Sequence, residues 1–143
     1  MRHSIAGRAT VVGTTLRAVA SVFSIAATGA KIRTVTVTNT VAVAFVATLV
    51  RFTNATGVGT GLTEFDYDAA NPALCTGFAG HTADGAVGAA LAQVTIGAAV
   101  GAGYTWVFGD SGILIPVGTA NGFGIICGTG TGQICDYTIE WDE

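Results

Sequence analysis

The chain has 143 residues, of which 50% are hydrophobic and only 10% are charged, whereas an ordinary soluble domain has about 25% charged residues. This length suits one domain with its own core, and no run reaches the roughly 20 apolar residues of a membrane helix. Six dispersed cations without interleaved aromatic residues argue against nucleic-acid binding. The scarcity of charge predicts that other subunits cover much of the surface, because interfaces lose charged residues as cores do.

The formal net charge of −3 conceals a division along the chain. Every basic residue lies in the first 51 positions, and every acidic residue lies at position 64 or later. Two interpretations remain open: the basic part meets an acidic surface on a neighbouring molecule, or the two groups pair within the fold. The first interpretation makes five residues candidates for a subunit interface: Arg2, Arg8, Arg17, Lys31 and Arg33.

Residues 1–30 contain two possible strands, 5–12 and 16–25, and we expect this part to form an N-terminal arm that lies on a neighbouring molecule. The arm is followed by a β-sandwich domain over 31–143. Residues 31–39 alternate between valine and threonine, which is typical of a strand with one buried face. In residues 41–53 the odd-numbered and the even-numbered positions are both mostly apolar, which predicts a central strand covered on both faces.

The second half of the chain continues this β pattern with one interruption. Residues 62–67 alternate again, but 68–88 have no period and predict either a short helix at 72–75 or a protruding excursion that touches a partner. Another strand follows around 94–100, and 101–143 reads as four strands separated by glycine-rich turns. Eight to ten strands without an amphipathic helix predict an all-β fold, a jelly-roll-like β-sandwich with an N-terminal arm.

The last strand has the clearest pattern in the chain. Its apolar residues share one face, and its polar residues share the other. The apolar set is Cys135, Tyr137, Ile139 and Trp141, and the polar set is Asp136, Thr138, Glu140 and Asp142. We therefore expect one buried and one solvated face.

Several motifs suggest chemistry, but each has a simpler structural explanation. Residues 109–112 spell GDSG, as in trypsin-like proteases, yet a turn between strands accounts for the same letters. Glu64, Asp66 and Asp68 alternate, which favours a solvated strand face over a calcium site. The glycine-rich stretch 128–132 precedes a strand rather than a helix, so we expect a hairpin turn and not a phosphate loop. The sequence therefore predicts no enzyme, no cofactor and no metal site.

The cysteines do not form a disulfide framework, because there are only three, Cys75, Cys127 and Cys135. Cys127 and Cys135 flank the 128–132 turn and could lie opposite each other in a hairpin. We expect buried free thiols instead, since free cysteine is commonly a small core residue.

Two stretches carry a resemblance to a known group. One stretch resembles the end of small virion structural proteins of tailed bacteriophages. It reads TWVFGDSGILIPVGTANGFGIICGTGTGQICDYTIEWDE and includes the segments IPVGTANGFGI and GTGQICD. The upstream stretch VTVTNTVAVAFVATLVRFTNATG is similar to the same group. The resemblance covers roughly residues 34–143 and leaves the N-terminal arm unmatched.

This resemblance implies a capsid cement or decoration protein, a homotrimer that binds the major capsid protein. The protein would be assembled in the host cytoplasm and located at the capsid surface of the virion. In that case the arm and its basic residues would dock on the shell, and the partners would include neither nucleic acid nor a membrane. The alternative is a tail or fibre-tip component that binds host glycans, which requires exposed aromatic residues beside polar groups.

Overall fold

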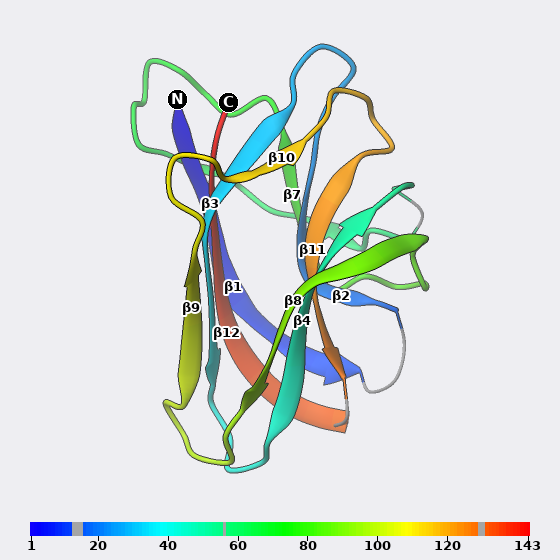
Figure 1. Cartoon of the computed structure of the whole chain (residues 1–143), viewed down its shortest axis with the longest axis vertical. Helices are drawn as coiled ribbons and strands as arrows, with labels where there is room; N and C mark the ends of the chain where they lie inside the picture. The colour runs from blue at the N-terminus through cyan, green and yellow to red at the C-terminus, as the bar shows by residue number, and fades with distance from the viewer. Residues whose placement is uncertain (13–15, 56, 129–130) are drawn as a thin grey trace.

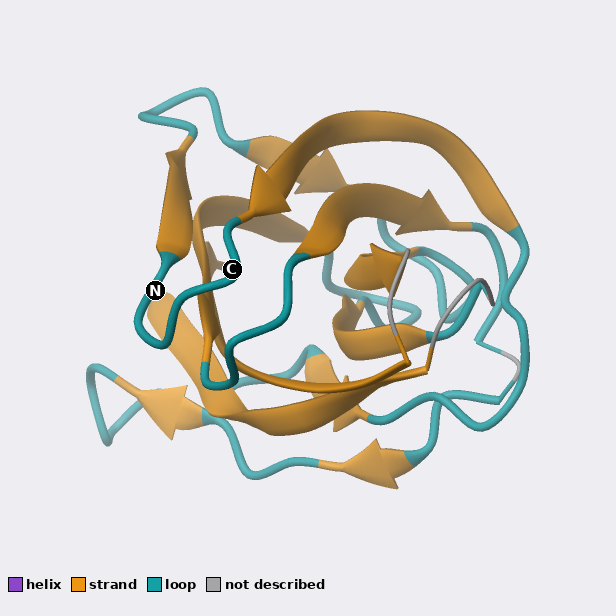
Figure 2. Cartoon of the chain, turned by 90° about the horizontal axis from the view of Figure 1, so that it is seen from below, coloured by secondary structure: helices purple, strands orange, loops and turns teal. Residues whose placement is uncertain are grey.

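The computed structural model describes residues 1–12, 16–55, 57–128 and 131–143, and in them the chain forms strands and no helix. A membrane-spanning helix is accordingly not found in this part of the chain. The strands form two antiparallel sheets that pack face to face around one core (Figure 1). Both sheets curve around this core when the molecule is seen from one end (Figure 2). The predicted all-β sandwich is confirmed.

Each sheet has six strands. Sheet A has the order β10–β3–β12–β1–β6, and β9 also pairs with β3. Its strands are β10 (Ile113–Ile115), β3 (Ala30–Asn39), β12 (Thr131–Asp142), β1 (Arg2–Val12), β6 (Phe65–Asp66) and β9 (Gly103–Val107). Sheet B has the order β5–β7–β2–β11–β4–β8. Its strands are β5 (Thr60–Gly61), β7 (Thr76–Ala79), β2 (Ala18–Phe23), β11 (Gly122–Gly128), β4 (Phe45–Phe52) and β8 (Val87–Ile96).

Four nested strand pairs define the topology. β1 pairs with β12, β2 with β11, β3 with β9, and β4 with β8, all antiparallel. The chain is therefore folded like one long hairpin whose pairs alternate between sheet A and sheet B. This arrangement is the jelly roll that the strand count predicted.

The first 30 residues do not form an arm separate from a 31–143 domain. β1 lies in the interior of sheet A, between β12 and β6, with a register that runs from Arg2 opposite Asp142 to Val12 opposite Thr131. All six residues of β2 are buried, and β2 lies between β7 and β11 in sheet B. The prediction of an arm is corrected because these strands carry inward apolar residues that complete the common core.

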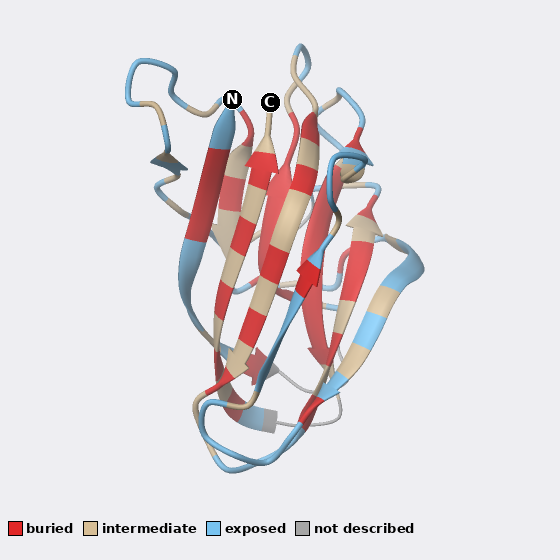
Figure 3. Cartoon of the chain, turned by 60° about the vertical axis from the view of Figure 1, so that its left-hand side comes forward, coloured by how far each residue is buried: buried red, intermediate tan, exposed pale blue. Residues whose placement is uncertain are grey.

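The alternation predicted for the last strand is confirmed. Its apolar residues are at most 3% exposed and face the core, whereas its polar residues are partly exposed. The same banding along neighbouring strands is visible in Figure 3. Burial of large side chains such as Trp141 contributes roughly 1.5–3 kcal/mol each, which makes β12 a principal source of stability.

β4 contributes to two separate apolar clusters. Phe45, Ala47 and Leu49 point into the main core, and Val50 and Phe52 belong to a second cluster. A register irregularity next to Val50 accompanies this change of side. The prediction of a strand buried on both faces is therefore confirmed, with the strand limited to Phe45–Phe52.

The segment between β4 and β8 packs against the sandwich. Through β6 it adds a strand beside β1 in sheet A, and through β7 it adds one beside β2 in sheet B. The strand predicted over 62–67 shortens to β6, and the unpatterned stretch 68–88 contains β7. Residues 72–75 form no helix, so that alternative is wrong. Backbone groups of this segment instead form hydrogen bonds with other parts of the same chain. Such bonds are needed because buried backbone groups are rarely left unpaired.

The cysteines are free and buried, as expected, but they are not hairpin partners. Cys127 lies in β11 of sheet B and Cys135 lies in β12 of sheet A, so the two strands belong to opposite layers. A hydrogen bond with Cys135, together with burial, raises the pKa of the Cys127 thiol. Residues 129–130, at the centre of the predicted 128–132 turn, lie outside the described residues.

Gly124 tests how tightly the second cluster is packed. A Cβ at this position would lie 2.6 Å from Cε2 of Phe52 and 3.0 Å from the Ala20 carbonyl oxygen. We expect Gly124→Ala to lower the free energy of unfolding by about 1–3 kcal/mol because the overpacked atoms must shift. Urea denaturation measures the change. Gly61→Ala is the control, since a Cβ at Gly61 meets nothing within 4 Å, and an equal loss in both variants would contradict the packing argument.

Acid should destabilise the fold through His81. Burial lowers the pKa of this histidine from 6.5 to about 4, and its ring packs against Phe52 with centroids 5.2 Å apart. Between these two values the unfolded chain binds more protons than the folded chain, so stability falls as pH decreases. We expect a loss of at most about 3 kcal/mol over this window, measured by urea denaturation at pH 7 and pH 4.5. His81→Gln should show a shallower pH dependence, and an identical slope would exclude this role.

Candidate functional site

The outer face of sheet A carries ion pairs between strands that are distant in sequence. Asp142 on β12 accepts hydrogen bonds from Nε of Arg33 at 2.5 Å and from Nε of Arg2 at 3.2 Å. Partial burial by itself would raise the pKa of Asp142, but the bonds from Arg33 and Arg2 outweigh it and leave the pKa below its usual value. This carboxylate therefore remains ionised and joins β3, β12 and β1.

The other predicted interface residues differ in their pairing. Arg8 donates two hydrogen bonds to Asp136, at 2.6 and 3.0 Å. These bonds lower the pKa of the Asp136 carboxyl below its usual value. Arg17 lies 3.4 Å from Asp84. Lys31 has no ion-pair partner among the described residues. For four arginines the structure thus supports pairing within the fold, while their role at a subunit or capsid interface stays a prediction.

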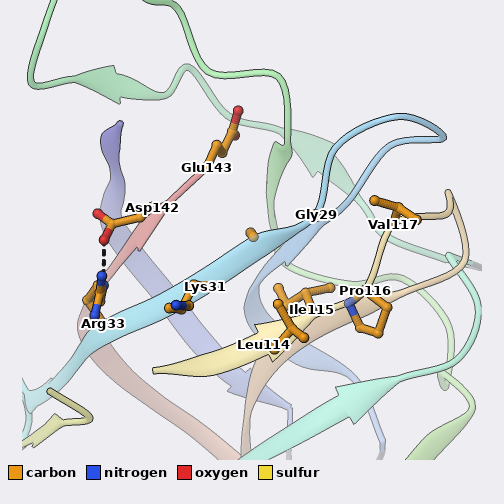
Figure 4. A pocket seen from close by; sticks show the side chains of 10 residues that line it. Gly29, Lys31, Arg33, Leu114, Ile115, Pro116, Val117, Asp142 and Glu143 are labelled. Atoms are coloured by element: carbon orange, nitrogen blue, oxygen red, sulfur yellow. Dashed lines mark hydrogen bonds and ion pairs between the residues drawn. The ribbon is translucent and has the colours of Figure 1, made fainter. Parts of the chain in front are cut away.

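A cleft of about 470 Å³ lies beside β10 (Figure 4). Leu114, Pro116 and Val117 form its apolar side, and Lys31 reaches it from β3. The carboxylate of Glu143 at its end accepts bonds from the Leu74 and Cys75 backbone N–H groups and from Trp141 Nε1. Of the charged side chains that line the cleft, Arg33 and Asp142 pair with each other, and neutral N–H groups bond the Glu143 carboxylate.

The acidic residues 64, 66 and 68 stabilise the excursion and do not form a solvated strand face. Asp66 Oδ1 is 2.9 Å from Nδ1 of the buried His3 and also accepts the Ala73 N–H at 2.9 Å. Glu64 accepts the Gly77 N–H at 2.8 Å. No group of three potential metal ligands occurs in the described ranges.

The GDSG stretch forms the turn between β9 and β10, as predicted. Gly109 and Gly112 have φ values of 60° and 58°, a conformation that glycine adopts without strain. The histidines have other partners, since His3 bonds Asp66 and His81 Nε2 lies 2.7 Å from Ser21 Oγ. Ser111 is therefore not next to a histidine base in this fold.

Residues 85–109 form a segment that contains many exposed residues and no charged ones, and we call this segment the uncharged rim. It runs for 25 residues between Asp84 and Asp110 and contains no lysine, arginine, histidine, aspartate or glutamate. Val107 is 74% exposed and Val100 is 71% exposed. Exposed apolar patches are one mark of an interaction surface on a protein.

The rim is built from two strands at the same side of the sandwich. β8 is the last strand of sheet B, and β9 pairs only with β3 in sheet A. The rings of Tyr104 and Trp106 on β9 have centroids 4.9 Å apart and planes at 65°, an edge-to-face contact. In Figure 3 most of β8 and β9 is drawn as exposed or intermediate.

The sequence interpretation did not identify this rim. It predicted a strand around 94–100 with even-numbered apolar residues, whereas β8 is Val87–Ile96 and begins in an alanine- and glycine-rich stretch. Small residues give no clear period, so the strand pattern is weak there. The available signal was the absence of charge over 25 consecutive residues.

Comparisons with protein-family models, with curated proteins and with solved structures gave no match for this chain.

Asp66 provides a test of the contacts that hold the excursion. We expect Asp66→Ala to lower the free energy of unfolding by about 1–3 kcal/mol, because His3 and the Ala73 N–H both lose their acceptor. Asp110→Ala is the matched control, since the Asp110 side chain is fully exposed and 3.9 Å from Arg33. Urea denaturation of both variants measures the difference. Equal stabilities would show that the buried histidine does not need this carboxylate.

Proposed function

We propose that this protein is a virion structural protein that acts by protein–protein contact, as a cement or decoration protein on the capsid surface. The observation that carries the proposal is the uncharged rim, which is exposed in the single chain. Loss of charge together with aromatic and apolar exposure characterises the centre of protein interfaces. The resemblance of residues 34–143 to phage virion proteins supplies the virion context.

The proposed mechanism is binding of an assembled surface. A protein that binds the assembled shell of major capsid protein, and not its separate subunits, stabilises the shell by mass action. Apolar area supplies the free energy, at about 25 cal/mol per Å² removed from water. The proposal includes a homotrimer assembled in the host cytoplasm, because several copies multiply the contact area. Jelly rolls occur in viral capsid proteins, but this fold alone does not define a function.

Exposed aromatic residues favour one other function, binding of host glycans by a tail or fibre tip. Phe65 lies in β6 and Tyr67 directly follows that strand, and the two residues are 64% and 60% exposed. The Tyr67 hydroxyl donates to Glu140 at 2.7 Å, so polar groups lie beside the rings. Glycan binding that is lost in Phe65→Ala and Tyr67→Ala, without any binding to shells, would favour this function over the cement role.

Co-sedimentation with empty tailed-phage shells that lack this protein tests the cement role. We expect the purified protein to pellet with the shells, and Val100→Lys with Val107→Lys to weaken this binding at least about tenfold. Burial of each added ammonium group costs more than the roughly 1.4 kcal/mol that a tenfold change requires.

Thr10→Lys is the matched control, because Thr10 is exposed on β1, far from the rim in the sheet order. It adds the same charge and should pellet like the unmodified protein. Failure of the unmodified protein to pellet with any shell would overturn the proposal.

A further inference from the structure

The free edge of β8 is the feature of the rim that specifies a partner. β8 pairs along one side with β4, from Ile96 opposite Phe45 to Val87 opposite Phe52. Along its other side no backbone hydrogen bond occurs within the described part of the chain. A row of N–H and C=O groups is therefore available to another extended strand.

The remaining edges are less suited to pairing with another chain. β5 and β6 have two residues each, and β10 has three. The outward carbonyl of Leu114 in β10 already accepts a hydrogen bond from Arg51, which closes that edge toward sheet B. β9 has five residues, whereas β8 has ten. Short strands, edge charges and bulges are the usual protection against strand addition. β8 is long and uncharged, and its register irregularities lie opposite Leu49–Phe52, so residues 92–96 pair regularly with β4.

The side chains of β8 fit an identical strand. Residues 88–91 are Gly-Ala-Ala-Leu, and all four are exposed, as are Gln93 and Thr95. Two copies that meet along this edge place no like charges opposite each other, because the rim is uncharged.

We propose that β8 pairs antiparallel with β8 of a second copy of this chain, around a two-fold axis. Strand addition of this kind joins the two B sheets into one continuous sheet. An isologous contact is closed, so it ends at two copies and does not propagate into a fibre. The inference rests on the assembly part of the proposed function. Because the contact is two-fold, it is separate from the three-fold contact of a trimer and links copies in pairs.

Cysteine cross-linking tests the geometry. Leu91, Gln93 and Thr95 lie on one face of β8, and each is replaced singly by cysteine. The native cysteines are at most 1% exposed and do not compete. In a two-fold antiparallel pair only the position next to the axis faces its own copy, so oxidised glutathione should give a disulfide-linked dimer that peaks at one position. Thr10→Cys on the exposed face of β1 is the control and should remain uncross-linked.

The mass in solution gives a second measurement. Lysine at whichever of these three positions cross-links most strongly places two ammonium groups close together at the axis. We therefore expect the mass of this lysine variant by analytical ultracentrifugation to be half that of the unmodified protein. Thr10→Lys should keep the full mass. Circular dichroism verifies that both variants are folded. Uniformly low cross-linking along β8, or an unchanged mass for this folded lysine variant, would overturn the inference.

These outcomes are independent of the capsid role. Cross-linking at β8 without pelleting on shells would refute the cement function and support the β8 pair. Pelleting on shells without cross-linking or loss of mass would refute the β8 pair and leave the cement function intact.

Discussion

The pairing of β1 with β12 is the contact on which the rest of the sandwich depends. It joins residues from opposite ends of the sequence, and the ion pair between Arg2 and Asp142 spans 140 positions. Each inner strand pair of the jelly roll is nested within this outer pair. Closing so long a loop costs conformational entropy, which the burial of residues such as Ile5, Ile139 and Trp141 offsets.

The position of β12 also determines where charge is located. Alternation along the strand directs Tyr137, Ile139 and Trp141 into the core, so that Asp136 and Asp142 must face outward. β1 and β3 flank β12 and bring Arg8, Arg2 and Arg33 to the same face. The outer face of sheet A is therefore polar and internally neutralised, and exposed pairs of this kind contribute little to stability.

The opposite side of the sandwich has a different character. β8 and β9 are the outer strands of their sheets, and both fall within the 25 residues that contain no charge. The molecule thus has a solvated, charge-paired face and an apolar rim with unused backbone hydrogen-bonding groups. A protein with this asymmetry can associate along one side and remain soluble on the other. The proposed contacts between copies would account for its low charge content, since interfaces lose charged residues as cores do.

Part of this structure could be predicted from the sequence because strand alternation is a local property. Three patterns correspond to strands in the structure. The alternation of 135–142 lies in β12, the valine–threonine pattern of 31–39 lies in β3, and the stretch 41–53, apolar on both faces, contains β4. Their side chains show which face is buried before any partner strand is known. The scarcity of charge likewise predicts a surface covered by other subunits, which stays a prediction.

The partners of these strands were decided only in the tertiary structure. Residues 1–30 had strand character, but only the pairing of β1 with β12 and of β2 with β11 places them inside the sandwich rather than in an arm. The pairs of Arg8 with Asp136 and of His3 with Asp66 depend on register across distant strands, which composition does not encode. β8 shows the same limit, since its small residues have weak periodicity and its free edge exists only because no strand follows it in sheet B. Side-chain alternation is local, whereas strand neighbours and edges depend on packing of the whole chain.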